Sequence, residues 1–256
     1  MIIRRFFLLL LVSVAVVALP AAAVDPAKPA NSVPREANDA GYRYLVLETA
    51  GAKPGALLPM IVGLHYSGAR PETMLEYFDQ IDFPVRIVLP QGAYTRREGY
   101  SWFSTDYAQL SAAQQDDAAF DAERKLSAFV DSATAKYATR GKPIAMGISY
   151  GGDLAFLLAI RDPDKVRAAF PVAARFLPAW MPKTNTCKPH CPPIYAMHGD
   201  ADTTVPMGPT QQAAARLREM DFDVAFEPYP GVAHDFDARM EKDFSEKAKS
   251  LLVTQP

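Results

Sequence analysis

Ser149 stands in the stretch Gly147-Ile-Ser-Tyr-Gly151, and glycines at this spacing around a serine are typical of a serine nucleophile. A serine hydroxyl is a weak nucleophile at neutral pH, so a histidine must accept its proton and an acid must hold that histidine in the right tautomer. His234 and an aspartate before it can supply these groups in the chain order serine, acid, histidine. Together they would perform acyl transfer, in which the serine attacks a carbonyl carbon, forms an acyl-enzyme and is then released by water.

The acid of this set has two possible positions. His198-Gly-Asp-Ala-Asp-Thr-Thr-Val-Pro206 places Asp200 and Asp202 after a predicted strand, and spacing alone does not choose between them. Asp200 directly follows the turn, where an aspartate commonly stabilises the loop by bonding to its backbone. Asp202 lies further out and can reach across to His234, so we predict that Asp202 is the catalytic acid.

The remaining histidines are poorer choices for the base. His65 and His198 each end a predicted strand and precede the part of the chain that should supply the base, and we expect them to bond to backbone near the site. His190 lies between the two cysteines and is the weakest choice. We therefore predict His234, in the loop before the last helix, as the base.

Attack on a carbonyl places negative charge on its oxygen, so two backbone N–H groups must point at that oxygen. Tyr150, immediately after the predicted nucleophile, should supply one of them. The other should come from the loop His65-Tyr66-Ser67-Gly68, where we predict Ser67 as the donor and Tyr66 as the alternative.

Apolar side chains near these loops could form a pocket for the acyl group. Apolar walls with few polar groups would suit a hydrophobic ester, although each of these side chains could equally pack beneath a long loop. Tyr66, Trp102 and Trp180 are our first choices, and the others are Phe103, Phe176, Leu177 and Met181.

The elements that must position these residues alternate between short apolar runs and longer helical patterns. This alternation predicts an α/β fold, a mostly parallel sheet with helices on both faces and ligands at the carboxyl ends of its strands. Ser149 falls between a predicted strand and a predicted helix, as a nucleophile turn requires. Strands are expected at 42–48, 60–65, 85–89, 144–148, 168–172, 194–197 and 224–229, and helices at 71–79, 112–137, 150–161, 208–220 and 235–252.

The N-terminal segment has the layout of a secretory signal peptide. Arg4 and Arg5 precede an apolar run over 6–19, and Ala21 and Ala23 provide a cleavage site after residue 23. An uncleaved membrane anchor is the alternative, but the run is shorter than the roughly 20 apolar residues that span a bilayer. We expect an exported protein, periplasmic or extracellular, without stable membrane insertion after cleavage. Residues 24–40 would form an exposed Pro-rich linker, and residues 41–256 one domain.

Charge and cysteine usage narrow the possible partners further. Cleavage after residue 23 leaves 25 basic against 29 acidic residues, which does not favour nucleic acid as a partner. Cys187 and Cys191 are the only cysteines, and in an exported chain we predict that they form a local disulfide. A metal site with His190 would crowd three ligands into five residues, so we expect neither metal nor cofactor.

These motifs together resemble the phospholipase/carboxylesterase and dienelactone-hydrolase-like branch of the α/β hydrolases. The resemblance covers about Val62 to His234, and in that family the position of Asp202 is the catalytic acid. Relatives often carry His-Gly where this chain has His65-Tyr66, so Tyr66 is expected to narrow the pocket. The matching stretches are Val62-Gly-Leu-His65, Ser101-Trp-Phe103, Gly147-Ile-Ser-Tyr-Gly151, His198-Gly-Asp-Ala-Asp-Thr-Thr-Val-Pro206 and Pro230-Gly-Val-Ala-His234.

The resemblance implies hydrolysis of a small-molecule carboxylic ester without a cofactor. A thioesterase or another acyl hydrolase on the same fold is the nearest alternative. A ligand-binding protein that kept the scaffold without its activity is the alternative of a different class. Such a protein would usually have lost one of Ser149, Asp202 and His234, and all three are present.

Overall fold

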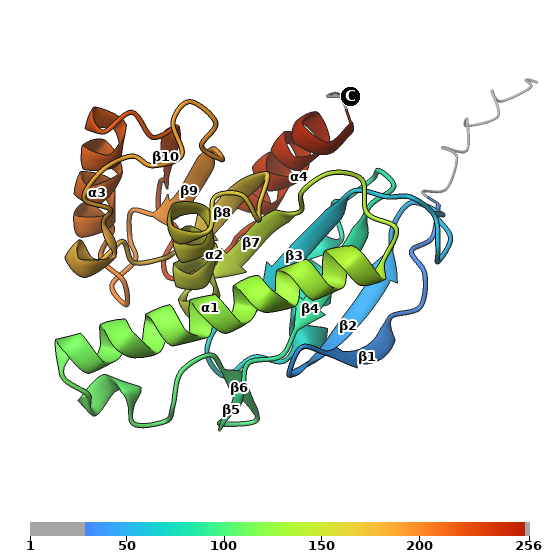
Figure 1. Cartoon of the computed structure of the whole chain (residues 1–256), viewed down its shortest axis with the longest axis horizontal. Helices are drawn as coiled ribbons and strands as arrows, with labels where there is room; N and C mark the ends of the chain where they lie inside the picture. Colours follow the sequence, from blue (N-terminus) through green and yellow to red (C-terminus); the bar gives the residue numbers. More distant parts are fainter. Residues whose placement is uncertain (1–28, 254–256) are drawn as a thin grey trace, which may run out of the picture.

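One sheet of eight strands runs through residues 29–253, the part of the chain that this computed structural model describes. Its order is β1-β2-β4-β3-β7-β8-β9-β10, with β1 and β2 antiparallel to their neighbours and the strands from β4 to β10 parallel (Figure 1). The strands are β1 Arg35–Asp39, β2 Tyr42–Glu48, β3 Met60–Leu64, β4 Arg86–Pro90, β7 Ile144–Ile148, β8 Ala168–Val172, β9 Ile194–Gly199 and β10 Val224–Tyr229.

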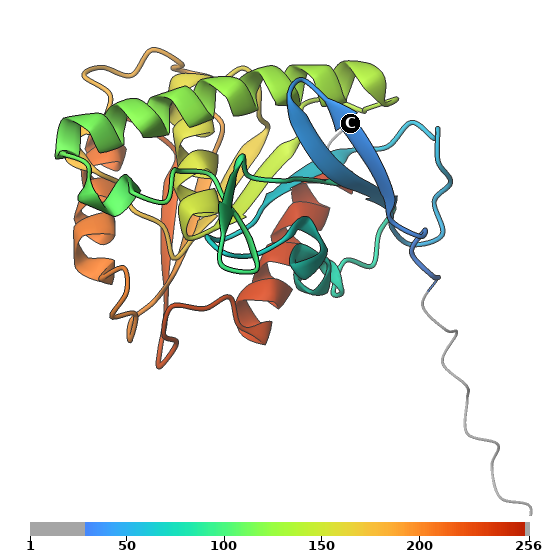
Figure 2. The ribbon, with the colours of Figure 1, turned by 90° about the horizontal axis from the view of Figure 1, so that it is seen from below.

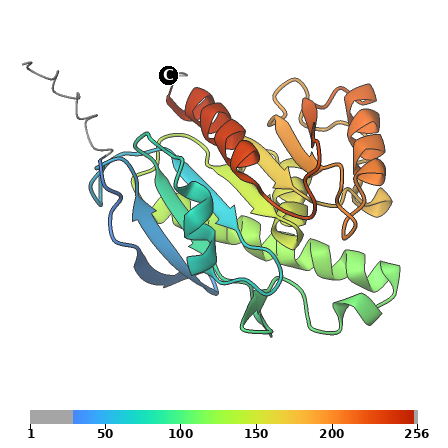
Figure 3. The same cartoon turned by 180° about the vertical axis from the view of Figure 1, so that it is seen from behind.

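Helices cover both faces of the sheet. α1 Ala112–Lys136, α2 Tyr150–Arg161 and α3 Met207–Glu219 pack on one face. α4 Ala238–Val253 and the 3-10 helix η1 Pro71–Phe78 pack on the other. Figure 2 shows α1 and α4 on opposite sides of the sheet, and Figure 3 shows α4 and η1 together from behind. The α/β fold predicted from the alternating pattern is confirmed.

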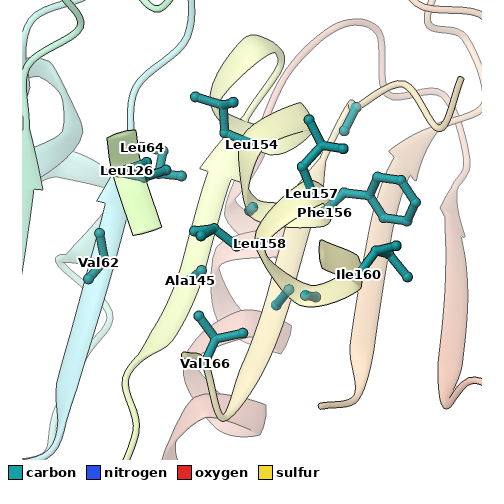
Figure 4. Close-up of a cluster of buried hydrophobic side chains, with 14 of the residues drawn as sticks. Val62, Leu64, Leu126, Ala145, Leu154, Phe156, Leu157, Leu158, Ile160 and Val166 are labelled. Atoms are coloured by element: carbon teal, nitrogen blue, oxygen red, sulfur yellow. The ribbon is translucent and has the colours of Figure 1, made fainter. Parts of the chain in front are cut away.

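The apolar core is divided by the sheet because successive side chains of a strand point to opposite faces. On β3, Val62 and Leu64 join the cluster beneath α1 and α2, whereas Ile61 joins the cluster beneath α4 and η1. Strands buried on both faces must be apolar at every position, which explains the continuous runs in the sequence. Figure 4 shows part of the first cluster, where Leu158 of α2 lies beside Ala145 of β7.

The helix α1 begins at a capping box. The Ser111 hydroxyl accepts a hydrogen bond from the Gln114 backbone N–H, and the Gln114 side chain accepts one from the Ser111 N–H. These two bonds satisfy backbone donors that a helix start leaves unpaired. The cap therefore sets where this helix of 25 residues begins.

Three short strands were not predicted from the sequence. β5 Tyr94–Arg96 and β6 Gly99–Ser101 form a hairpin apart from the main sheet. β1 pairs with β2 from Arg35↔Val46 to Asp39↔Tyr42, so the prediction that residues 24–40 are all exposed linker is wrong. No side chain of β1 is fully buried on either face, so the strand needs no apolar alternation and its polar sequence did not indicate a strand. The sheet therefore begins before residue 41.

The other expectations about the N-terminus and the cysteines can be compared only within the described residues. The expected signal peptide, 1–23, lies outside them. Cys187 and Cys191 form a disulfide in the connection between β8 and β9, as predicted. Within residues 29–253, no helix has both the length and the apolar character needed to cross a bilayer, and no three side chains of His, Cys, Asp or Glu are grouped to hold a metal ion.

Glu123 of α1 is a buried acid that is incompletely paired. One carboxyl oxygen accepts a hydrogen bond from Arg161 at 3.1 Å, while the other has no hydrogen-bond partner. The side chain is 2% exposed, and burial together with the neighbouring Asp162 raises the pKa of Glu123 to about 7. An unfolded glutamate ionises near pH 4.5, so between about pH 4.5 and 7 the folded protein binds a proton that the unfolded chain does not.

This difference makes the free energy of unfolding fall as the pH rises through that window. We expect Glu123→Gln, which keeps the shape without the charge, to stabilise the protein by about 1 to 3 kcal/mol near pH 8 and by much less near pH 4. Urea unfolding at both pH values measures the effect, with the same change at the exposed Glu219 as control. A stability difference that is the same at both pH values would contradict the assignment.

Candidate active site

Ser149 lies on a strained turn between β7 and α2. Its backbone has φ 55° and ψ −119°, a conformation that residues with a side chain rarely adopt. A Cβ atom at Gly147 would lie 2.2 Å from the Gly151 carbonyl oxygen, and one at Gly151 would lie 2.2 Å from that of Leu64. Both glycines are therefore required by sterics, and the turn presents the Ser149 hydroxyl at the carboxyl end of the sheet.

Ser149, His234 and Asp202 form a continuous chain of hydrogen bonds. The Ser149 Oγ–H donates to His234 Nε2 at 3.0 Å, and His234 Nδ1–H donates to Asp202 Oδ2 at 2.7 Å. The direction follows from the carboxylate, which can only accept and so places the ring proton on Nδ1. The three residues come from the loops after β7, β9 and β10. Their arrangement can remove a proton from the serine hydroxyl as it attacks.

The two aspartates after β9 have different partners. Asp202 is buried, and its second oxygen accepts hydrogen bonds from the backbone N–H groups of Thr204 at 2.9 Å and Val205 at 2.8 Å. Asp200 instead accepts one from the Gly231 N–H at 2.7 Å. Asp200 thus joins the loop after β9 to the loop after β10, while Asp202 contacts His234.

His65 and His198 bond to backbone beside the site, as expected. His65 Nδ1–H donates to the Tyr66 carbonyl at 2.8 Å, and its Nε2 accepts from the Gly92 N–H at 2.9 Å. Burial lowers the pKa of His65 to about 4, so the ring stays neutral at ordinary pH. His198 Nε2–H donates to the Val205 carbonyl at 2.8 Å, and burial lowers its pKa as well. Each neutral ring thus holds a loop that carries site residues.

A cavity of about 640 Å³ opens at Ser149 and His234. Its wall is not the apolar one that the sequence suggested as a possibility, because Arg96, Arg97 and Arg175 all contribute to it. The remaining lining residues are Tyr66, Ser67, Tyr77, Ile148, Tyr150, Asp153, Thr204, Val205, Asp235 and Phe236.

Of the three side chains predicted first for substrate binding, Tyr66 lines the cavity and the two tryptophans do not. Trp102 and Trp180 are each 3% exposed. The indole N–H of Trp102 donates to the His65 carbonyl at 2.7 Å, and that of Trp180 donates to Asp116 at 2.9 Å. Neither tryptophan therefore has the role in a pocket that we expected: both pack in the core, where Trp102 bonds to the end of β3 and Trp180 to α1.

Part of the predicted apolar set does line a neighbouring cavity of about 500 Å³. Phe176, Leu177 and Met181 form its apolar wall. This second cavity shares Arg175, Thr204 and Val205 with the first, so the two adjoin. Phe103, also in the predicted set, instead stacks on Tyr107 in the core, with ring centroids 4.3 Å apart.

Two backbone N–H groups in the cavity that holds Ser149 have no hydrogen-bond acceptor within the described residues. Ser67 and Tyr150 both line the cavity, and within residues 29–253 neither backbone N–H donates to another group of the protein. The Ser67 loop is held in place because the Gly68 N–H donates to the Tyr100 carbonyl and the Tyr100 N–H donates to the Ala69 carbonyl, both at 2.8 Å. These amides are therefore free to bond to a bound oxygen atom.

An ion pair that the sequence reasoning missed lies in the wall of the cavity. The Arg175 guanidinium bonds to Asp153 Oδ2 at 2.9 and 2.5 Å, and the Arg175 backbone N–H bonds to Oδ1 at 2.8 Å. Burial raises the pKa of the Asp153 carboxyl, and Arg175 counteracts that rise. A charged residue within the apolar run of α2 was the available signal, because such a residue requires a partner.

The sheet order and the serine turn after a central strand define an α/β-hydrolase fold. The sequence model of the phospholipase/carboxylesterase family matches residues 59–251, and the protein belongs to this family. It is accordingly a hydrolase of carboxylic esters. No protein of curated function matches the sequence.

Solved structures with the same fold include several esterases. The esterase PE8 is 21% identical with a TM-score of 0.66, covering 78% of this chain and 95% of that one. A Bacillus cereus carboxylesterase is 13% identical with a TM-score of 0.67, covering 82% and 95%. A Mesorhizobium loti carboxylesterase is 17% identical with a TM-score of 0.66, covering 84% and 98%. At these identities the similarity is one of fold.

Proposed function

We propose that the protein cleaves its ester through a covalent acyl-enzyme on Ser149, with His234 as general base and Asp202 as the acid that orients it. The observation that carries the proposal is the chain of hydrogen bonds from Ser149 through His234 to Asp202, at 3.0 and 2.7 Å. Three residues of the right types, from three separate loops, meet at hydrogen-bonding distance, and two of them, Ser149 and His234, line one cavity.

The first half of the reaction forms the acyl-enzyme. Ser149 Oγ attacks the carbonyl carbon while His234 Nε2 takes its proton, and Asp202 stabilises the imidazolium that results. The other oxygen of Asp202 accepts hydrogen bonds from two backbone N–H groups, which hold the carboxylate in its orientation toward His234. His234 then gives the proton to the leaving alcohol, and the carbon–oxygen bond breaks.

The second half reverses these roles with water. His234 removes a proton from a water molecule, which attacks the acyl carbon, and the proton returns to Ser149 as the acid leaves. In both halves negative charge develops on the carbonyl oxygen. We assign the Ser67 and Tyr150 N–H groups to that oxygen, since both border the cavity and both are unpaired within the described residues.

We expect Ser149→Ala to lower kcat by at least about a thousandfold, because no other group replaces the nucleophile. Hydrolysis of a para-nitrophenyl ester series, from acetate to longer acyl chains, measures this loss. A fluorophosphonate probe should label the unmodified protein and not the variant. Ser104→Ala is the matched control and should keep both activity and labelling. Unchanged hydrolysis in Ser149→Ala would overturn the assignment.

The variants Asp202→Asn and Asp200→Asn test which of the two aspartates is the catalytic acid. An asparagine at 202 cannot hold the imidazolium, so we expect kcat to fall by about 100- to 10,000-fold. An asparagine at 200 can still accept the Gly231 N–H bond, so activity should remain close to that of the unmodified protein. Steady-state kinetics of both variants on one ester provide the comparison. Equal losses would contradict the separate roles given to them.

We also propose that the protein is exported. The order of charged, apolar and small residues in the first 23 positions supports this location, and so does the disulfide between Cys187 and Cys191, since such bonds persist in oxidising compartments. On expression of the full chain in bacteria we expect a mature N-terminus at Val24, determined by N-terminal sequencing of the protein outside the cytoplasm. Recovery of the uncleaved chain from the cytoplasm alone would overturn the proposal.

A further inference from the structure

Two arginines face the catalytic cavity without a carboxylate partner. Arg96 and Arg97 lie at the turn of the β5–β6 hairpin and line the cavity that holds Ser149. Within residues 29–253, neither guanidinium has a carboxylate within 4.0 Å or a hydrogen bond to another group of the protein. Arg175 in the same wall differs, since Asp153 neutralises it.

The hairpin that carries these arginines is fixed to the loop that carries Ser67. Gly68 and Ala69 exchange backbone hydrogen bonds with Tyr100 of β6, each at 2.8 Å. At Gly99 the two backbones approach so closely that a Cβ atom would lie 2.3 Å from the Gly68 carbonyl oxygen. The backbone at Arg96 and Arg97 therefore has a defined position relative to the place where the ester carbonyl would lie.

The position of Arg97 is unfavourable for an arginine on conformational grounds. Its φ is 52°, in the left-handed region where glycine or asparagine is preferred at hairpin turns. The conformation gives no reason for an arginine here, whereas the cavity does, because Arg97 lines its wall and carries a permanent positive charge.

The charges on the cavity wall do not cancel. Asp153 is occupied by Arg175, and the other acid, Asp235, is exposed and accepts a hydrogen bond from the Phe236 N–H. Apart from the pair Asp153–Arg175, the wall therefore contains two arginines and one carboxylate, and that carboxylate pairs with neither arginine. A wall with this excess of positive charge attracts anions and disfavours cations.

We propose that the ester cleaved at this site carries an anionic group, a carboxylate or a phosphate, which Arg96 and Arg97 bind while the ester carbonyl lies at Ser149. The planar guanidinium donates paired hydrogen bonds that match either anion. This inference rests on the proposed function, and the anionic group takes no part in the hydrolysis itself. It determines which esters enter and how they are oriented.

Matched pairs of esters test the proposal. For an anion on the acyl side, the para-nitrophenyl monoester of glutaric acid is compared with that of glutaramic acid, in which a neutral amide replaces the carboxylate. For an anion on the alcohol side, para-acetoxybenzoate and para-acetoxyphenyl phosphate are each compared with para-acetoxybenzamide. Rates are corrected with the Ser149→Ala variant. We expect kcat/KM to be at least about tenfold higher for one anionic ester than for its neutral partner, and this ratio to fall as sodium chloride is added.

The double variant Arg96→Gln, Arg97→Asn assigns the preference to these side chains. Asparagine tolerates a positive φ, so the turn should persist without its charge. We expect the ratio of anionic to neutral kcat/KM to fall by about tenfold, toward one. Arg124→Gln, which removes one positive charge from the exposed face of α1, is the control and should leave the ratio unchanged. Circular dichroism and fluorophosphonate labelling establish that the double variant is folded.

The outcomes are distinguishable. Hydrolysis of the neutral esters as fast as the anionic ones in every pair would overturn this inference and leave the proposed function standing. An anion preference that persists in the double variant would overturn the role of Arg96 and Arg97. Absence of hydrolysis of every ester, together with absence of fluorophosphonate labelling, would overturn both the proposed function and the inference drawn from it.

Discussion

Close contact between backbones at glycines holds the whole site in register. Gly151, directly after the Ser149 turn, lies against the carbonyl of Leu64 at the end of β3, where a Cβ atom would be 2.2 Å away. Gly199 at the end of β9 lies against the carbonyl of Val232 with the same separation. The first contact joins the Ser149 turn to the loop of Ser67, and the second joins the Asp202 loop to the His234 loop. Any larger residue at Gly151 or Gly199 would move two parts of the site at once.

Around these contacts, buried polar groups determine the positions of the loops, and the histidines among them are uncharged. Burial lowers the pKa of both His65 and His198, which favours their neutral rings, and each ring bonds to backbone. Asp153 and Arg175 pair in the wall of the cavity, where the loss of one partner would leave the other without its hydrogen bonds. The site is therefore supported by polar contacts that are largely satisfied within the protein.

Sequence reasoning performed well where chemistry or burial constrains the residues strongly. The turn around Ser149 was predicted because only glycine fits its flanks, and α2 was found over the predicted residues because the strand and helix patterns meet at that serine. β1 and the β5–β6 hairpin were missed because short strands outside the core show no apolar alternation. The polar cavity was missed for a related reason. Aromatic residues such as Trp102 indicate apolar surroundings, but their number does not reveal whether they line a pocket or pack in the core.

The two edge strands of the sheet determine whether the sheets of two molecules can pair with each other. At one edge, β1 carries Arg35, Glu36 and Asp39, and Glu36 pairs with Arg43 of β2 at 2.7 Å. At the other, β10 carries Pro228, which lacks a backbone N–H, beside the exposed Glu227. Charges and proline at an edge hinder another strand from continuing the sheet. If the enzyme is exported as proposed, such edges would let it accumulate beyond the reach of cytoplasmic chaperones without its sheets joining into aggregates.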